Sequence, residues 1–163
     1  MSFFQFQNPF AVGRNINSTN MRIPGCAVYE TTNQSITFNT TTALTFSFES
    51  FDRGGMHDIS VNPSRIYILR AGVYIVTGRI AWASNATGTY REFGLRQNGS
   101  AQIDVQNVLP SSVFAPCQVI ASAHLFSAGD YIELTVFHDS NPGPENVLNA
   151  TAAGRFAALW IGA

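Results

Sequence analysis

Residues 72–82 read GVYIVTGRIAW, and large apolar side chains recur at every second position through most of the stretch. Successive side chains of an extended chain point to opposite sides, so Tyr74, Val76, Ile80 and Trp82 would share one face. A period of two is typical of a half-buried β-strand. The stretch therefore predicts a sheet with one face packed on a core.

The same alternation recurs in three other segments of the chain. Asn98-Gly99 separates two alternating segments and favours a β-hairpin, because both residues tolerate positive φ. We count about ten short strands with no helical periodicity between them, which indicates an all-β sandwich or jelly roll. The three segments are LTFSFESF (44–51, inward Leu44, Phe46, Phe48), AQIDVQNV (101–108, inward Ile103, Val105) and YIELTVFH (131–138, inward Ile132, Leu134, Val136).

Composition narrows the range of functions. The chain has 163 residues, a length that suits one domain, with a net charge of -1 and 12% charged residues. This balance gives no basic surface for nucleic acid or for an anionic membrane, and we expect neither as a partner. All nine basic residues are arginine, so mechanisms that need a lysine amine are excluded. No apolar stretch approaches the ~18 residues of a membrane span.

The first 25 residues differ from the rest of the chain. Phe3, Phe4, Phe6 and Phe10 lie among Gln, Asn and Pro, and a stretch rich in turn-forming residues without periodicity follows. We interpret residues 1–25 as an extended arm and residues 26–163 as the folded domain. Four exposed phenylalanines favour docking onto a partner. The alternative is an arm folded back on its own domain.

The last apolar segment, RFAALWIG (155–162), is apolar on both sides. A strand of this kind must be covered on both faces. In a two-layer sandwich a second subunit can provide the outer cover, although a loop above a central strand would give the same pattern. Our predicted subunit interface consists of Phe156, Leu159, Trp160 and Ile161.

Cysteine and histidine spacing gives no metal motif. Cys26 and Cys117 are far apart, no CxxC occurs, and the three histidines are scattered. We expect two buried thiols, with a Cys26–Cys117 disulfide as the alternative. No cofactor is expected.

Residues 51–58, FDRGGMHD, combine Asp52, His57 and Asp58 around a glycine pair. The segment directly follows a predicted strand, and Gly54-Gly55 gives the backbone freedom for a sharp turn. Aspartates in turns usually accept hydrogen bonds from backbone amides. We interpret the segment as a turn. Calcium bound at Asp52 and Asp58 is the alternative, although calcium needs six or more oxygens.

Two loops are candidates for ligand contact, because binding residues often lie on loops of rigid β scaffolds. The first, FHDSNPGPENV (137–147), carries His138, Asp139, Asn141 and Glu145, with a plain solvated connection as the alternative. The second, WASNATGTY (82–90), could stack on a sugar, although Trp82 is expected to face the core. We expect no enzyme, since no acid, base and nucleophile converge by motif.

Four segments, taken together, resemble the C1q/TNF-like jelly-roll domain in order and spacing. They are RAGVYIVTGRIAW, YREFGLRQNGS, ASAHLFSAGDYIELTVFHDS and GRFAALWIG. The stretch FDRGGMHD followed by NPSRIYILRAGVY is most similar to C1q-like domains of bacteriophage virion proteins and of some bacterial surface proteins. The resemblance covers residues 26–163.

The resemblance implies a ten-stranded antiparallel jelly roll that assembles as a homotrimer, with its first and last strands near the threefold axis. Phage relatives are typically capsid-decoration, fibre or spike components. It therefore implies a structural virion protein, made in the host cytoplasm and attached to a capsid or tail by its arm. The alternative is a module that binds a host receptor or surface glycan through loops 83–89 and 139–146.

Overall fold

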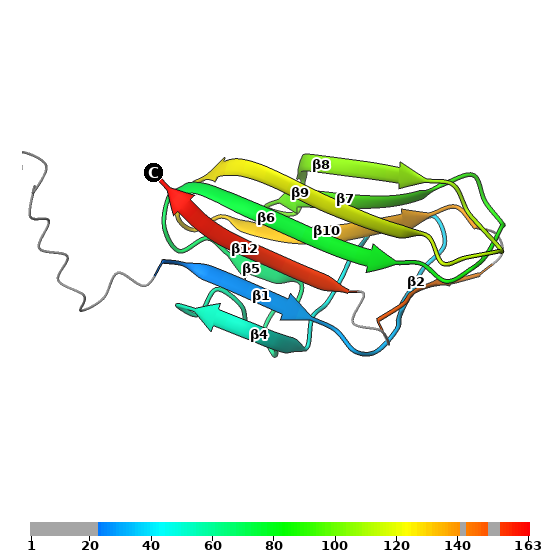
Figure 1. Cartoon of the computed structure of the whole chain (residues 1–163), viewed down its shortest axis with the longest axis horizontal. Helices are drawn as coiled ribbons and strands as arrows, with labels where there is room; N and C mark the ends of the chain where they lie inside the picture. Colours follow the sequence, from blue (N-terminus) through cyan, green and yellow to red (C-terminus); the bar gives the residue numbers. More distant parts are fainter. Residues whose placement is uncertain (1–22, 141–142, 150–153) are drawn as a thin grey trace, which may run out of the picture.

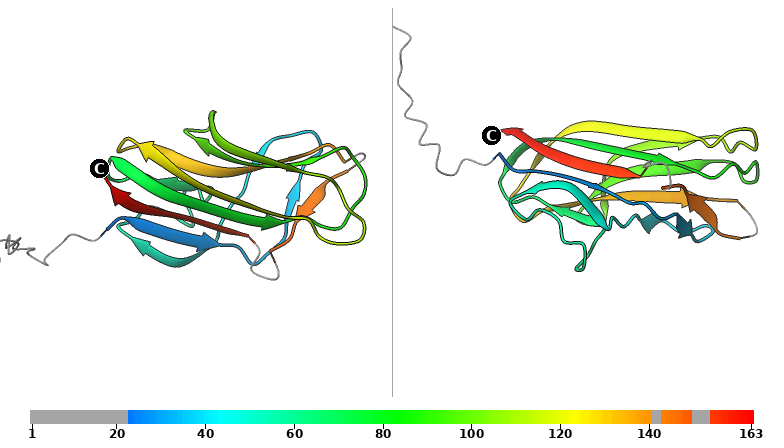
Figure 2. Two further views of the ribbon diagram at one scale, coloured as in Figure 1. Left: turned by 45° about the horizontal axis from the view of Figure 1, so that its top comes forward. Right: turned by 60° about the horizontal axis from the view of Figure 1, so that its bottom comes forward.

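The computed structural model describes residues 23–140, 143–149 and 154–163. These residues form two antiparallel sheets stacked face to face, with short connections at both ends of the sandwich (Figures 1 and 2). The all-β jelly roll predicted from the alternating segments is confirmed.

Each main sheet has five strands. Twelve strands occur in the described residues rather than about ten, because four of them are only two or three residues long. The first sheet has the order β4 (Phe48–Arg53), β1 (Gly25–Tyr29), β12 (Arg155–Gly162), β6 (Gly72–Ala81) and β9 (Cys117–Phe126). The second has the order β3 (Thr42–Ala43), β10 (Tyr131–His138), β7 (Arg91–Gln97) and β8 (Ala101–Val108), and β5 (Arg65–Tyr67) also pairs with β10. A small sheet pairs β2 (Gln34–Ile36) with β11 (Glu145–Val147).

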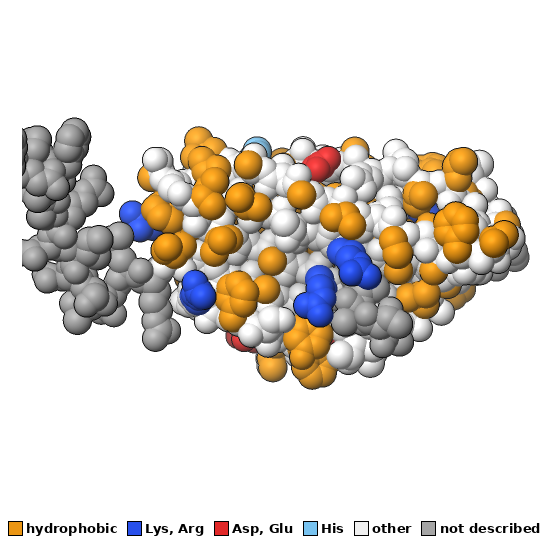
Figure 3. Space-filling model, in the orientation of Figure 1, with side chains coloured by type: hydrophobic (Ala, Val, Ile, Leu, Met, Phe, Trp, Pro, Cys, Tyr) orange, Lys and Arg blue, Asp and Glu red, His pale blue; other side chains and the backbone are white. Residues whose placement is uncertain are grey.

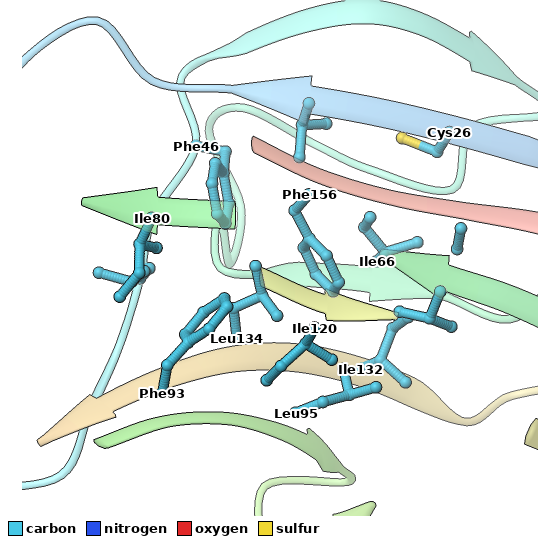
Figure 4. Packing of buried hydrophobic residues seen from close by; sticks show 14 of the residues in the cluster. Cys26, Phe46, Ile66, Ile80, Phe93, Leu95, Ile120, Ile132, Leu134 and Phe156 are labelled. Carbon is cyan, nitrogen blue, oxygen red and sulfur yellow. The ribbon is translucent and has the colours of Figure 1, made fainter. Parts of the chain in front are cut away.

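Side chains from both sheets meet in one core (Figure 4). The four residues of 72–82 predicted to share a face are all fully buried, as are Ile132, Leu134 and Val136 of β10. Trp82 faces this core, as expected, and its indole N–H donates to Oε1 of Gln118 at 2.8 Å. A buried indole N–H usually finds such a partner, since an unpaired donor is costly in an apolar interior.

The prediction for residues 44–51 holds only in its first half. Leu44 and Phe46 are buried, but Phe48 is exposed. The chain leaves β3 in the second sheet at Ala43 and enters β4 in the first sheet at Phe48, so residues 44–47 cross the sandwich edge. The alternation breaks because the second half of the segment belongs to a different sheet. Val105 on β8 is also more exposed than its alternation predicted.

The predicted hairpin at Asn98-Gly99 joins β7 to β8. Asn98 has φ 52° and Gly99 has φ 75°, and two successive positive values are what a two-residue hairpin turn requires. The side chain of Asn98 donates to Asp130 at 2.9 Å and accepts the amide of Tyr131 at 3.0 Å. These two bonds tie the hairpin to the start of β10.

The first and last strands of the described chain are neighbours. β1 pairs with β12 along its whole length, from Gly25 opposite Leu159 to Tyr29 opposite Arg155. The start of β1 and the C-terminus therefore lie at one end of the sandwich (Figure 1). Phe3, Phe4, Phe6 and Phe10 of the predicted arm lie outside the described residues.

The cysteines do not form a disulfide. Both thiols are free; Cys26 is buried, whereas Cys117 is exposed, contrary to the expectation of two buried thiols. Burial, with a smaller contribution from the nearby Asp52 and Glu49 carboxylates, raises the pKa of the Cys26 thiol to about 12. A thiol with this pKa is inert, because the thiolate is the reactive form.

Candidate functional site

The outer face of the β4-β1-β12-β6-β9 sheet carries exposed apolar side chains (Figure 3). We call this surface the apolar face. Its strands pair so that Leu159 lies opposite Ile75, and Ile75 lies opposite Ala123. Contiguous exposed apolar surface on a soluble domain usually marks a place where another molecule binds. Its large exposed members are Phe48, Phe51, Ile75, Val119, Leu125, Leu159 and Ile161.

The last strand has one side in the core and the other on the apolar face. Leu159 and Ile161 point outward and are 41% and 52% exposed. Phe156 points inward, is fully buried and packs against Phe46 at a centroid distance of 5.7 Å. Phe156 therefore belongs to the core of its own chain, which corrects its place in the predicted interface.

Trp160 lies between the two environments. Its ring packs against the core cluster, its indole N–H donates to the carbonyl of Ala71 at 3.2 Å, and the guanidinium of Arg70 lies 4.2 Å from its ring centroid. The residue closes one end of the sandwich and leaves part of its ring exposed. Of the four predicted interface residues, Leu159 and Ile161 are the two on the apolar face.

A hollow of about 320 Å³ opens on the apolar face. It exists because small side chains, Ala27, Ala157 and Thr77, lie next to one another in the strand registers. Arg79 and Arg155 line the hollow together with Val119 and Ser50. The surface therefore combines an apolar floor with two guanidinium groups.

The FDRGGMHD segment ends β4 with Phe51, Asp52 and Arg53, and the chain turns from Gly54 onward. Gly54 and Gly55 have φ 121° and 78°, and the Asp52 carboxylate accepts the amides of Met56 and His57 at 2.9 and 3.1 Å. The Asp58 carboxylate accepts the amides of Ser60 and Val61 at 2.7 and 3.0 Å. These contacts agree with the interpretation as a turn, and they direct the two carboxylates to different backbone segments.

Two residues of the predicted ligand loop are buried, which conflicts with an exposed binding role. His138 ends β10 fully buried; its Nε2 lies 2.9 Å from the carbonyl of Ile36, and its Nδ1 faces the amide of Ser140. Glu145 is bonded to Arg91 at 3.2 Å, and the two side chains are only 4% and 1% exposed. We therefore remove His138 and Glu145 from the candidate ligand contacts.

The ion pair of Arg91 and Glu145 is the centre of a buried polar network. Nη2 of Arg91 also donates to the carbonyl of Thr87 at 3.1 Å, and the side chain of Asn85 donates to Glu145 at 2.7 Å. The network joins the loop after β6 to β11. Its role is to hold the loops at this end of the sandwich in place.

Asp139 also has a structural role. Its carboxylate accepts the backbone amides of Thr89 and Tyr90 at 2.7 and 3.2 Å, and it accepts the hydroxyl of Thr89. Asn141, the fourth predicted ligand residue, lies outside the described residues. The loop therefore offers no assembled set of ligand groups among the residues that the structure describes.

Changing Asp139 to asparagine is expected to destabilise the protein in a pH-dependent way. The hydroxyl of Thr89, and then the amides of Thr89 and Tyr90, hold the pKa of Asp139 below its usual range despite some burial. A lowered pKa in the folded state stabilises the fold above about pH 4, and this contribution is lost as pH falls through the folded-state value. The free energy of unfolding of Asp139→Asn should be roughly 1 kcal/mol lower at pH 7.

The test is urea unfolding of both proteins between pH 7 and pH 3. The difference should begin to shrink below about pH 4, where the unfolded-state carboxylate takes up a proton, and it should be lost as pH falls through the lowered folded-state value. Glu92→Gln is the matched control, because no hydrogen bond to its carboxylate occurs within the described chain and little effect is expected. A difference that persists unchanged at low pH would contradict the proposed role of the charge.

The sequence analysis missed an exposed apolar loop between β8 and β9. Leu109, Val113 and Phe114 are 76%, 87% and 65% exposed, the highest values among the large apolar residues together with Leu125. The loop lies at the end of the sandwich opposite the C-terminus (Figure 1). A signal was present in the sequence, since LPSSVFAP (109–116) contains three large apolar residues, two of them between its two prolines, and no charge.

No known protein family and no curated protein matches the sequence. Solved structures do match, and all three below are less than 15% identical to this chain. Murine APRIL gives a TM-score of 0.64 at 9% identity and covers 86% of this chain and 100% of its own. The globular domain of zebrafish complement 1qA gives 0.64 at 11% identity, covering 85% and 97%. Eiger TNF from S. frugiperda gives 0.59 at 12% identity, covering 86% and 93%.

The chain has a TNF/C1q-like jelly-roll fold. At this level of identity the likeness concerns the fold and carries no function with it. The described residues hold no helix with the length and apolarity to cross a membrane. They also hold no group of three or more His, Cys, Asp or Glu side chains that could together bind a metal ion.

Proposed function

We propose that this chain is a structural virion protein, a homotrimeric decoration, tail or fibre component that its N-terminal arm attaches to a capsid or tail. The observation that carries the proposal is the apolar face. Its exposed side chains are large and contiguous across β12, β6 and β9, and cover by further copies would remove them from water.

The resemblance to C1q/TNF-like domains implies that the first and last strands lie near the threefold axis of a trimer. The apolar face belongs to the sheet that contains both strands, so the fold supports the trimer. The virion assignment is supported by the sequence resemblance of residues 51–74 to phage C1q-like domains. The arm supports it as well, since four phenylalanines within ten residues suit burial in another protein. No catalytic step is part of the proposal.

Deletion of residues 1–20 tests the role of the arm. The truncated protein is expected to remain a folded trimer, because β1 begins only at Gly25, but to fail to join its particle. The measurement is sedimentation velocity, which should give three times the mass of the truncated chain, and three times 17.7 kDa for the full-length protein, together with co-purification with particles. A full-length variant with alanine at Phe3, Phe4, Phe6 and Phe10 separates loss of the side chains from loss of length. Normal incorporation of the truncated protein would end the arm proposal.

A second candidate function, binding to a host surface, is favoured by the apolar loop 109–116. The loop is uncharged and lies away from the C-terminal end, so a host protein with an apolar cleft would suit it better than a charged glycan. A Val113→Ser, Phe114→Ser variant should bind host cells at least tenfold less well while remaining a trimer. Equal binding by the two proteins would remove this candidate.

A further inference from the structure

Arg79 and Arg155 form a like-charge pair on the apolar face. They are direct cross-strand partners of β6 and β12, and both line the hollow. Side chains in such positions have Cβ atoms roughly 4.5–5.5 Å apart, and like charges placed there destabilise a sheet. The guanidinium of Arg155 lies 5.9 Å from the ring centroid of Tyr29 on β1. An anionic group in the hollow would offset the repulsion between the two arginines.

The charge of this surface limits how copies can meet. In a two-fold pair, the same patch of both subunits comes together, so a pair centred on the hollow would bring arginines against arginines. A closed ring of three instead joins two different surfaces at each contact. The surface that meets the hollow should therefore carry a carboxylate.

The hydrogen bonds of the carboxylates identify one candidate. Of the ten Asp and Glu residues, all described, eight accept hydrogen bonds that hold their own fold together. Asp104 accepts only the amide of the adjacent Val105, at 2.8 Å. Glu92 has no hydrogen bond among the described residues, but it lies on β7, inside the sheet between β10 and β8.

Asp104 lies on β8, which ends the second sheet. β8 is next to β9, which ends the first sheet, and the side chain of Gln118 joins them by donating to the carbonyl of Gln106 at 2.8 Å. Val105 and Val119 are exposed along this double edge. Open sheet edges present unpaired backbone groups and are commonly covered.

We propose that the hollow between Arg79 and Arg155 receives the Asp104 carboxylate of a second copy. The inference rests on the proposed trimer and specifies its contact, which joins the apolar face of one copy to the β8–β9 edge of the next. Ser50 and Thr77 supply hydroxyl groups at the hollow, and Ala27 and Ala157 supply its apolar floor. The charge pair fixes which way the ring closes, since complementary charges set the register of an interface.

A charge exchange tests the contact. The face variant carries Arg79→Glu and Arg155→Gln, the edge variant carries Asp104→Arg, and a third protein carries all three changes. The face and edge variants should each raise the dissociation constant of the trimer ~30-fold or more, since breaking a buried charge pair at an interface has effects of this size. The combined protein should return to within about threefold of wild type.

Glu92→Arg is the matched control for the edge variant, with the same change of charge on a neighbouring strand, and it should stay within about threefold of wild type. Sedimentation equilibrium gives the dissociation constants, and circular dichroism on heating checks that each variant is folded. The contact is wrong if the face or edge variant has the dissociation constant of wild type, or if the combined protein does not regain that value. In either case, a wild-type protein that forms trimers still supports the proposed function. A wild-type chain that stays monomeric up to ~100 μM overturns both the proposed contact and the proposed trimeric function.

Discussion

Replacing Glu145 with leucine is expected to lower the free energy of unfolding by about 3 kcal/mol, because it leaves the guanidinium of Arg91 buried without its counter-charge. The two side chains are 4% and 1% exposed and bonded at 3.2 Å. The value lies at the lower end of the usual range, since Arg91 keeps its bonds to the carbonyls of Thr87 and Asn85. Urea unfolding at pH 7 and at one protein concentration measures the change.

The matched control replaces both partners, as Arg91→Met with Glu145→Leu. This protein should unfold within about 1 kcal/mol of wild type, because exchange of a whole buried ion pair for apolar side chains is often neutral. Asn85 loses its acceptor on Glu145 in both variants, so this loss cancels when the two variants are compared with each other. A single variant as stable as wild type would show that water reaches Arg91 in solution.

Replacing Leu159 with aspartate is expected to prevent assembly while leaving the chain folded. Leu159 lies at the centre of the apolar face on β12, opposite Gly25 on β1 and Ile75 on β6. Cover of this face by another copy would place the new carboxylate in an apolar contact without a partner. The dissociation constant of the trimer should rise about 100-fold or more, which corresponds to about 2.8 kcal/mol.

The control for this prediction is Leu109→Asp, the same change at a more exposed leucine on the β8–β9 loop. It should leave the trimer intact, since Leu109 lies in the loop beyond the ends of β8 and β9, at the end of the sandwich opposite the C-terminus. Both proteins should melt near the wild-type temperature once they are compared as single chains, because neither leucine is in the core. A fully assembled Leu159→Asp protein would show that the apolar face is not the contact between copies.

The core and the fold class could be predicted from the sequence because their signal is local. Alternation alone placed Tyr74, Val76 and Ile80 in the core, and positive φ at Asn98-Gly99 follows from the two residue types. The same rule mispredicted Phe48, because alternation within one stretch does not reveal that the chain changes sheets. The apolar pattern on both sides of β12 indicated that apolar side chains would be exposed on one side, as Leu159 and Ile161 are. The pattern did not show which side faces the core, and Phe156 lies on that side.

The loops were less predictable because their structure depends on distant partners. His138 continues the inward series of Ile132, Leu134 and Val136, so its burial could have been inferred from the strand pattern. Glu145 could not be assigned in this way, since Arg91 lies 54 residues earlier in the chain. The pairing of Arg79 with Arg155 likewise becomes visible only once the register of β6 and β12 is known.

The opposite placement of the C-terminus and the β8–β9 loop has a practical consequence for engineering. A cargo peptide fused after Ala163 would emerge beside the start of β1, where it would crowd the segment proposed to anchor the protein. A peptide inserted between Ser111 and Ser112 would project from the far pole, clear of that attachment. A display scaffold built on this chain should therefore carry the inserted peptide in the β8–β9 loop and leave the C-terminus without a fusion.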